Sequence, residues 1–494
     1  MTTRATAATA GAPKPGDAAP AVQRIADLPG PRSWPWLGNI PQLRPDRLHQ
    51  QLEQWAEVHG TFYCLRFGRR RVVVLSDHAL VAALLRDRPE GFRRTELLER
   101  VWTELGLPGG VFGARGESWK RQRRMVMAGF DPGHVRRYLP QLQTVAARLV
   151  ERWTAAAQQG RAIDLQADLM RYTVDTIAGL AFGAEVDTLR SDGDIIQSQL
   201  DKIFPEMQRR LLSPLPTWRW WRSAADRRTA DSIAQVLRAV DGFIEQARTR
   251  LQDDPQRRAQ PANLLEAMLV AAGQSDSGIV DADVAGNVLT MLLAGEDTTA
   301  NTIAWALDLL WRRPEMLVRA TAEVRAALPR DCLPSHDTLA QLPFIEACLH
   351  ETMRLKPVAP LLNFQAERDT TIGTLQVPAR TVILTLMRRD SVSRRHLRDA
   401  QSFEPARWLG GAGGVAGLGS DAGGLRRLSM PFGAGPRICP GRYLALVEMK
   451  MALAVLLSRF EIESIDTPDG LPARERLSFT MVPVGLHMRL RLRA

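Results

Sequence analysis

The most constraining feature of the sequence is one cysteine, Cys439, in a glycine-rich segment that ends just before a long apolar, helix-like pattern. The segment reads Phe432-Gly433-Ala434-Gly435-Pro436-Arg437-Ile438-Cys439-Pro440-Gly441. Its glycines permit a backbone that turns amide hydrogens toward the sulfur, and such donors spread the charge of a metal-bound thiolate. Pro440 suits the first position of the next helix, whose positive end should lower the pKa of the thiol. The loop therefore predicts a thiolate ligand.

Arg437 lies two residues before Cys439 and offers a fixed cation of the kind that pairs with an anionic haem propionate. The pattern Phe-x-x-Gly-x-Arg-x-Cys-x-Gly, which begins at Phe432, closely resembles the haem-binding signature of cytochromes P450. The resemblance implies that Cys439 is the axial ligand of the haem iron and that Phe432, Gly433 and Gly441 belong to the haem-binding loop. The alternative is an ordinary buried thiol in a glycine-rich turn.

A second constellation lies in the apolar segment 284–311, which predicts a long buried helix. Its acidic residues make it unsuitable as a transmembrane helix. The central sequence, residues 294–299, reads Ala-Gly-Glu-Asp-Thr-Thr and resembles the oxygen-binding groove of the distal helix in cytochromes P450. The resemblance implies that Thr298 holds water and dioxygen and that Asp297, next to Glu296, relays protons through water. The alternative is an ordinary helix-capping or surface Asp-Thr pair.

A third motif joins two distant parts of the chain. Glu351 and Arg354 have the spacing of an everyday surface ion pair on a helix, worth about 0.3 kcal/mol. Residues 403–408 match the pattern Phe-x-Pro-x-Arg-aromatic of the same family and contain Arg407. The resemblance implies that these three residues form a buried structural network that supports haem retention. Since buried charges need full pairing, losing one of them should cost several kcal/mol.

Trp119 and Arg123 match the Trp-x-x-x-Arg helix of the family. One helical turn apart, they can meet the same haem propionate, although such a pair also occurs as ordinary core and rim residues. The chain departs from the family in one place, because many members carry an arginine in the strand after the Glu351 helix where this chain has Phe364. We therefore expect Trp119, Arg123 and Arg437 to hold the propionates without help from that strand.

The rest of the pattern predicts a mainly α fold with small β-sheets. Residues 61–67 and 71–75 are typical of two paired strands, helical patterns dominate from 78 to 355, and β-rich stretches follow at 370–386 and 478–492. The resemblance implies the cytochrome P450 fold. We expect a disordered tail at residues 1–20, a single domain over 21–494 and a flexible surface insertion at 410–424.

Composition narrows the class of protein further. The chain has 494 residues, of which 45% are hydrophobic and 24% charged, which is ordinary for a globular protein with a large core. Four scattered cysteines do not form a disulfide framework and favour a reducing cytoplasm. The first 20 residues contain no apolar stretch long enough for a membrane anchor.

The formal charge of +11 does not indicate nucleic-acid binding, because the arginines are spread along the chain. The densest basic run is residues 120–124, Lys-Arg-Gln-Arg-Arg. In the P450 comparison this run flanks the haem face where a reductant docks. A solvated basic helix face without a partner is the equal alternative.

The resemblance implies a monomeric, cytoplasmic haem-thiolate monooxygenase that carries haem b and uses O2. It receives electrons from a separate ferredoxin or flavodoxin with its reductase, and it hydroxylates or epoxidises a hydrophobic small molecule such as a fatty acid, terpenoid or steroid. By analogy the pocket is lined by residues 105–112 and by Leu293, Ala294, Val358, Ala359, Leu361, Leu362, Met481 and Val482. Two alternatives remain: a haem-thiolate peroxygenase or isomerase that needs no O2, and a haem-binding sensor.

Overall fold

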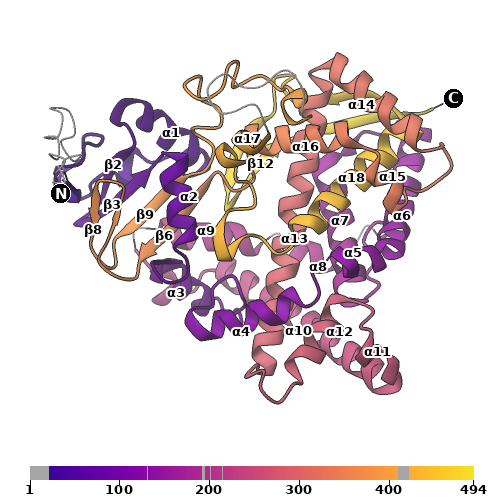
Figure 1. The fold of residues 1–494 in the computed structure, drawn as a ribbon, viewed down its shortest axis with the longest axis horizontal. Coiled ribbons are helices and arrows are strands. Elements are labelled where there is room, and N and C mark those ends of the chain that lie inside the picture. Colours follow the sequence, from indigo (N-terminus) through magenta and orange to yellow (C-terminus); the bar gives the residue numbers. More distant parts are fainter. Residues whose placement is uncertain are drawn as a thin grey trace, which may run out of the picture.

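The computed structural model describes residues 22–130, 132–191, 195–200, 202–213, 215–409 and 422–493. The predicted tail at 1–20 and most of the predicted insertion at 410–424 lie outside these residues. Figure 1 shows the largest sheet at one side of the molecule, beside α1 and α2, while the longer helices fill the opposite side. The fold is therefore mainly helical with small β-sheets, as the sequence predicts.

The helices follow the apolar periodicity of the sequence. They are α1 (Leu48–His59), α2 (His78–Arg86), α3 (Glu96–Glu104), α4 (Gly116–Met127), α5 (Pro132–Arg137), α6 (Leu139–Gln158), α7 (Leu165–Thr176), α8 (Ile195–Leu200), α9 (Ile203–Leu212), α10 (Ala224–Asp253), α11 (Pro255–Ala259), α12 (Leu264–Ala272), α13 (Asp281–Trp311), α14 (Pro314–Ala327), α15 (His336–Ala340), α16 (Pro343–Leu355), α17 (Ala422–Leu428) and α18 (Arg442–Arg459).

The strands form small sheets. They are β1 (Gln23–Arg24), β2 (Phe62–Phe67), β3 (Arg70–Leu75), β4 (Phe92–Arg93), β5 (Ile163–Asp164), β6 (Leu361–Ala366), β7 (Thr370–Ile372), β8 (Leu375–Val377), β9 (Val382–Leu386), β10 (Phe460–Asp466), β11 (Arg474–Ser478), β12 (Thr480–Val484) and β13 (His487–Leu492). The largest sheet has the order β2-β3-β9-β6-β4, two others are β1-β8-β7 and β10-β13-β5, and β11 pairs with β12 as a hairpin.

Helix α13 runs through the centre of the molecule in Figure 1 and contains the whole predicted helix 284–311. Its side chains are buried on nearly all sides, because it packs against α7, α16, α18 and β12. Ala294 is an exception, since it is exposed in the middle of this otherwise buried helix. Among the described residues, no helix combines the length and hydrophobicity needed to cross a membrane.

The predicted strand pair at 61–75 is confirmed as β2 and β3, which pair in antiparallel register. The sequence prediction missed β10 and β11. The sequence of β11, Arg-Glu-Arg-Leu-Ser, is highly charged and has a low preference for β-structure. It becomes a strand because it pairs with β12 and because Glu475 enters a buried polar network.

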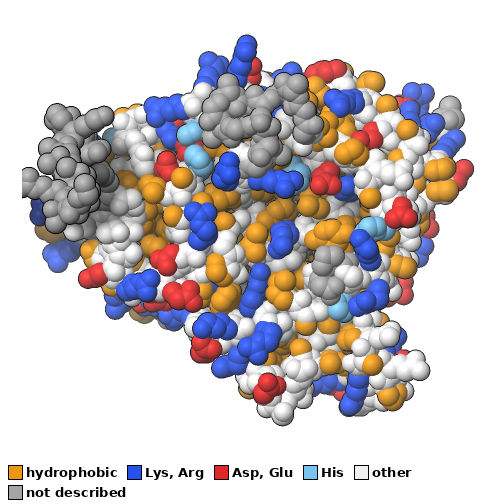
Figure 2. Space-filling view, viewed as in Figure 1, with side chains coloured by type: hydrophobic (Ala, Val, Ile, Leu, Met, Phe, Trp, Pro, Cys, Tyr) orange, Lys and Arg blue, Asp and Glu red, His pale blue; other side chains and the backbone are white. Residues whose placement is uncertain are grey.

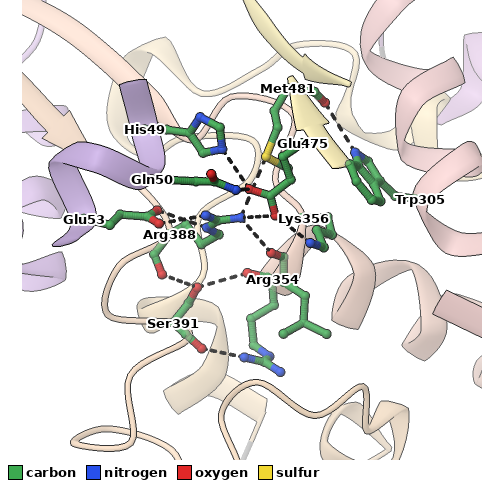
Figure 3. Close-up of polar contacts among 11 residues, drawn as sticks. His49, Gln50, Glu53, Trp305, Arg354, Lys356, Arg388, Ser391, Glu475 and Met481 are labelled. Carbon is green, nitrogen blue, oxygen red and sulfur yellow. Dashed lines mark hydrogen bonds and ion pairs between the residues drawn. The ribbon is translucent and has the colours of Figure 1, made fainter. Parts of the chain in front are cut away.

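Glu475 connects the β11–β12 hairpin to the core of the protein. Its carboxylate, only 6% exposed, lies 2.5–2.8 Å from the side-chain nitrogens of His49, Gln50, Lys356 and Arg388 (Figure 3). Arg388 also contacts Glu53 on α1 at 2.7 Å. Burial raises the pKa of Glu475, but the hydrogen bond from His49 and the charges of Arg388 and Lys356 outweigh it and hold that pKa far below its usual range. The hairpin base is thus fixed by charges that are fully paired.

Replacing Glu475 by Gln should lower the free energy of unfolding by about 3 kcal/mol, because the buried Arg388 and the partly exposed Lys356 lose a charge partner. Denaturant unfolding at neutral pH measures this loss. The partly exposed pair of Glu461 and Arg325 provides the control, and Glu461→Gln should cost less than about 1 kcal/mol.

The stability difference between the wild type and Glu475→Gln should depend on pH. A carboxylate with a depressed pKa contributes stability above its unfolded-state pKa of about 4.3 and loses that contribution on acidification. The stability difference between the wild type and Glu475→Gln should therefore be constant between about pH 6 and 8, where glutamate is ionised in both the folded and the unfolded state. The difference should shrink below about pH 4.3, the ordinary pKa of glutamate, because the unfolded state then takes up a proton. A difference that stays constant to strongly acidic pH would contradict this assignment.

Candidate haem-thiolate site

The Cys439 loop is a tight turn between α17 and α18. The amide of Cys439 donates to the carbonyl oxygen of Phe432 at 2.9 Å, which closes the loop. Gly433 and Gly435 have φ values of +74° and +73°, a left-handed conformation that favours glycine. A Cβ atom on Gly435 would lie 2.6 Å from the carbonyl oxygen of Leu85, so α2 approaches this loop too closely for any side chain.

Cys439 is a free thiol at the start of α18. Burial raises its pKa, while the amides of Gly441 and Arg442 and the charge of Arg123 lower it; in sum the pKa is raised. The predicted lowering by the helix end is therefore present but outweighed by burial. The prediction for Pro440 is wrong, because α18 begins at Arg442 with Gly441 as its N-cap and the proline lies before the helix.

The three candidate catalytic residues of α13 do not share one environment. Thr298 is partly exposed and donates to the carbonyl oxygen of Ala294 at 2.6 Å, so these two residues border one open face of the helix. Glu296 and Asp297 are buried. Successive helical residues are about 100° apart around the axis, so neighbours in sequence can lie on different faces. The structure thus separates the buried acids from the open face at Thr298.

The carboxylate of Asp297 has two donors. Asn301, one turn further along α13, donates to Oδ1 at 2.7 Å, and the hydroxyl of Thr480 on β12 donates to Oδ2. Burial raises the pKa of Asp297, and these two hydrogen bonds lower it without cancelling the effect of burial. The contact with Thr480 was not predicted, because nothing in the sequence relates the two positions.

The structure brings Glu351, Arg354 and Arg407 together. The guanidinium of Arg354 binds the Glu351 carboxylate in a bidentate pair at 2.7 and 2.8 Å, and both side chains are fully buried. Arg407 lies 3.5 Å from the same carboxylate. Trp408 Nε1 and the amide of Glu404 donate to it at 2.8 and 3.0 Å. Arg354 also donates to three backbone carbonyls, of Ser391, Ala400 and Ser402, and so joins α16 to the segment before the cysteine loop.

Trp119 and Arg123 lie on α4 against the cysteine loop. The guanidinium of Arg437 stacks over the Trp119 ring at 4.7 Å from its centroid. Arg123 donates to the carbonyl oxygen of Ile438 at 2.8 Å, and Arg437 donates to that of Ala114 at 2.6 Å. The three residues predicted to act together are therefore neighbours.

Two further arginines, Arg88 and Arg94, join this cluster and were missed by the sequence analysis. Their guanidinium groups lie 4.6 and 5.6 Å from the centroid of the Phe364 ring. Within the part of the chain that the structure describes, neither forms an ion pair. Burial lowers the pKa of both, and the charge of Arg437 lowers them further. Phe364 was the signal in the sequence that could have indicated them. Because this strand lacks the arginine that many family members carry there, other arginines could be expected to take its place.

The predicted pocket residues fall into two groups. Ala294 is exposed, and Val358, Ala359, Leu361 and Leu362 are partly exposed, so these five can line an open space. Three others are enclosed by protein: Leu293, Met481 and Val482. Figure 3 shows the sulfur of Met481 beside Arg388, 3.8 Å from Nη1, so this side chain enters the Glu475 network and not a pocket.

Comparison with known proteins identifies this arrangement. The cytochrome P450 family model matches residues 28–489. The mitochondrial 25-hydroxyvitamin D-1 alpha hydroxylase of Homo sapiens is 30% identical over 486 residues, covering 93% of this chain and 91% of that protein. Cytochrome P450 734A6 of Oryza sativa subsp. japonica is 28% identical over 450 residues, covering 85% and 79%. The crystal structure of the cytochrome P450DA heme domain matches the fold with a TM-score of 0.79 at 24% identity, covering 96% of this chain and 99% of that one.

The chain therefore belongs to the cytochrome P450 family. It is a haem-thiolate monooxygenase, an oxidoreductase that acts on small molecules with O2 and a redox partner. Its relatives include proteins named as mitochondrial and as chloroplastic.

The residues of this structure fit a haem. Arg88, Arg94, Arg123 and Arg437 form a cationic cluster, in which Arg88 is buried and the other three are partly exposed, and guanidinium groups remain charged in proteins. Such a cluster is unfavourable unless an anion compensates it. The two propionates of a haem supply the required negative charge, and Cys439 in the adjoining loop supplies an axial ligand of the expected type.

Replacing Arg94 by Met should therefore have opposite effects on the two forms of the protein. The haem-free protein should keep or gain stability, because a positive charge that Arg437 repels is removed, whereas the haem-bound protein should lose haem several-fold faster. Thermal unfolding of the haem-free form and haem transfer to an excess of apomyoglobin measure these effects. Arg100→Met, at an exposed position on α3, is the control and should change neither.

Proposed function

We propose that this P450 binds haem b through Cys439 and hydroxylates or epoxidises a hydrophobic small molecule. The observation that carries the proposal is the free thiol of Cys439 beside a cluster of arginines, none of which forms an ion pair within the described residues. We propose that Trp119, Arg123, Arg437, Arg88 and Arg94 hold the propionates. Bound haem supplies the activation of dioxygen, which thiolate ligation favours by donating electron density.

The protein groups around Cys439 have two tasks. The amides of Gly441 and Arg442 and the charge of Arg123 stabilise negative charge on the sulfur. The network of Glu351, Arg354 and Arg407 fixes the segment that leads into the loop. We infer that its role is structural, because all three side chains are occupied with one another and with backbone carbonyls.

On α13 we propose that Thr298 holds water at the open face of the helix and that Asp297 supplies protons, with Glu296 beside it. Thr298 can accept from water while its own hydroxyl hydrogen is donated to Ala294. Burial raises the pKa of Asp297, so this carboxyl holds a proton more readily than an ordinary aspartate does, as a general acid requires. The two residues then act as a general-acid pair through a water molecule.

The substrate is hydrophobic in this proposal, because the open lining residues Ala294, Val358, Ala359, Leu361 and Leu362 are all apolar. This lining accepts a fatty acid, a terpenoid or a steroid equally well. The human relative is named as a hydroxylase of 25-hydroxyvitamin D, so that compound is a suitable first probe.

The electron donor is an acidic ferredoxin or flavodoxin in this proposal. Lys120 and Arg124 are exposed on α4, the helix that carries Trp119 and Arg123, and Figure 2 shows several Lys and Arg side chains gathered over it. Charge complementarity of this kind mainly raises the rate of encounter. We also propose a monomer with a single domain over 21–494 and a cytoplasmic location. The four cysteines support that location, because all are free in the structure.

The first test is an absorption spectrum of the purified protein, reduced and exposed to carbon monoxide. A strongly red-shifted Soret band indicates thiolate ligation, and we expect it in the wild type. Cys439→Ser should lose this band, whereas Cys332→Ser, which removes an exposed free thiol, should keep it. A red-shifted band in Cys439→Ser would remove this residue as the ligand.

The role of Thr298 is tested by the fate of the electrons. Thr298→Ala should reduce product formation by up to about 10²-fold while electron consumption continues and hydrogen peroxide accumulates, because a proton-delivery contact is lost. Thr298→Ser keeps the hydroxyl and should behave like the wild type. Equal coupling of electrons to product in the alanine variant would show that Thr298 has no part in proton delivery.

A further inference from the structure

The tip of the β11–β12 hairpin has an unusual backbone conformation. Phe479, the residue between the two strands, has a φ of +69°, which is costly for a residue with a bulky side chain. Such a conformation persists only where the surroundings fix it. Here it turns the chain so that Thr480, the next residue, reaches Asp297 on α13.

The tip is held from outside by α9. The Phe204 ring stacks on that of Phe479 with centroids 4.6 Å apart and an interplanar angle of 8°. The side chain of Gln208 accepts from the amide of Phe479 and donates to the carbonyl oxygen of Leu477 at 2.9 Å. These contacts occupy the amide of Phe479 and the carbonyl oxygen of Leu477 at the tip.

The rest of the hairpin is held from inside. Glu475 fixes the first strand to the buried charge network, and Figure 3 shows Trp305 of α13 directed at the backbone of Met481. The indole nitrogen of Trp305 lies 3.4 Å from the carbonyl oxygen of Met481, whose amide donates to Val358 at 2.8 Å. Thr480 therefore sits between fixed neighbours and has little freedom to move.

The other side of Asp297 is equally fixed. Asn301 donates to Oδ1 of Asp297 at 2.7 Å, and its own amide oxygen accepts from Gln166 on α7 at 2.8 Å. The hydroxyl of Thr480 is the donor to Oδ2. Thr480 is 5% exposed and Asn301 0%, so water does not readily replace either donor.

We propose that Thr480 is a positioning residue for Asp297: its hydroxyl, held by the hairpin, fixes the orientation of the carboxyl that delivers protons. The proposal rests on the role given to Asp297 under the proposed function. It makes the hairpin part of the proton-delivery apparatus, although no residue of the hairpin exchanges a proton with substrate.

The consequence is measurable in the balance between two reactions. In the coupled reaction, substrate RH, O2, two electrons from the donor protein and two protons give ROH and water. In the uncoupled reaction, O2, two electrons and two protons give hydrogen peroxide, and RH is unchanged. Delivery of protons by a misplaced acid favours the second outcome, since small errors in position reduce rates strongly.

The test compares Thr480→Val, which keeps the volume but removes the hydroxyl, with Thr480→Ser, which keeps the hydroxyl. We expect the valine variant to raise the ratio of hydrogen peroxide to product by about 3- to 10-fold, and the serine variant to match the wild type. Thr352→Val is the matched control, because it also removes a buried threonine hydroxyl, one that donates within α16 to Cys348. Thr480→Ala replaces the valine variant if the latter does not bind haem.

A second readout is independent of turnover. The infrared carboxyl band of Asp297, identified as the band that disappears in Asp297→Asn, should shift in frequency in Thr480→Val and stay in place in Thr480→Ser and Thr352→Val. A peroxide ratio and a band both unchanged in Thr480→Val, when Asp297→Asn raises the ratio, would overturn the positioning role and leave the proposed function intact. An unchanged ratio in Asp297→Asn itself would overturn both the positioning role of Thr480 and the proton-delivery role of Asp297.

Discussion

The structure depends on a concentration of positive charge beside the cysteine loop. Arg88, Arg94, Arg123 and Arg437 come from separate parts of the chain, and burial together with neighbouring positive charges lowers the pKa of each of them. Removing such charges from water without an opposite charge beside them is unfavourable. The aromatic faces of Trp119 and Phe364 accept part of this charge. The two aromatic rings do not neutralise the positive charge, so the arginine cluster is stabilised only when an anion such as a haem propionate binds beside it.

Other charged side chains in the interior of this protein form ion pairs, and the arginine cluster differs from them in this respect. Glu351 and Arg354 are both fully buried and neutralise each other in a bidentate pair. Glu475 has partners from several segments of the chain. Because these networks leave few charges unpaired, the arginine cluster does not reflect a general tolerance for buried cations. The arginine cluster therefore indicates a binding site for an anionic ligand.

The sequence predicted the features that depend on local pattern. The central helix α13, the strand pair β2 and β3, and the cysteine loop all follow from periodicity, turn residues and glycine spacing. Arg88 and Arg94 could not be found in this way, because their importance comes from what they lack after folding. The direction of Met481 was also beyond sequence, since it depends on Arg388, 93 residues away. β11 was missed because its charged sequence is stabilised by tertiary partners and not by strand preference.

The two faces of α13 explain why the motif at residues 294–299 needs more than its own residues to function. Small side chains leave the helix open at Ala294, while one residue before Thr298 the helix turns Asp297 into the protein interior. The carboxyl of Asp297 is buried, and the two side chains that donate to it fix its orientation. Asn301 supplies one donor from the same helix, but the second comes from β12. The motif at residues 294–299 therefore supplies the acidic residue Asp297. The orientation of its carboxyl is fixed in part by Thr480, 183 residues later in a hairpin that Glu475 holds in place.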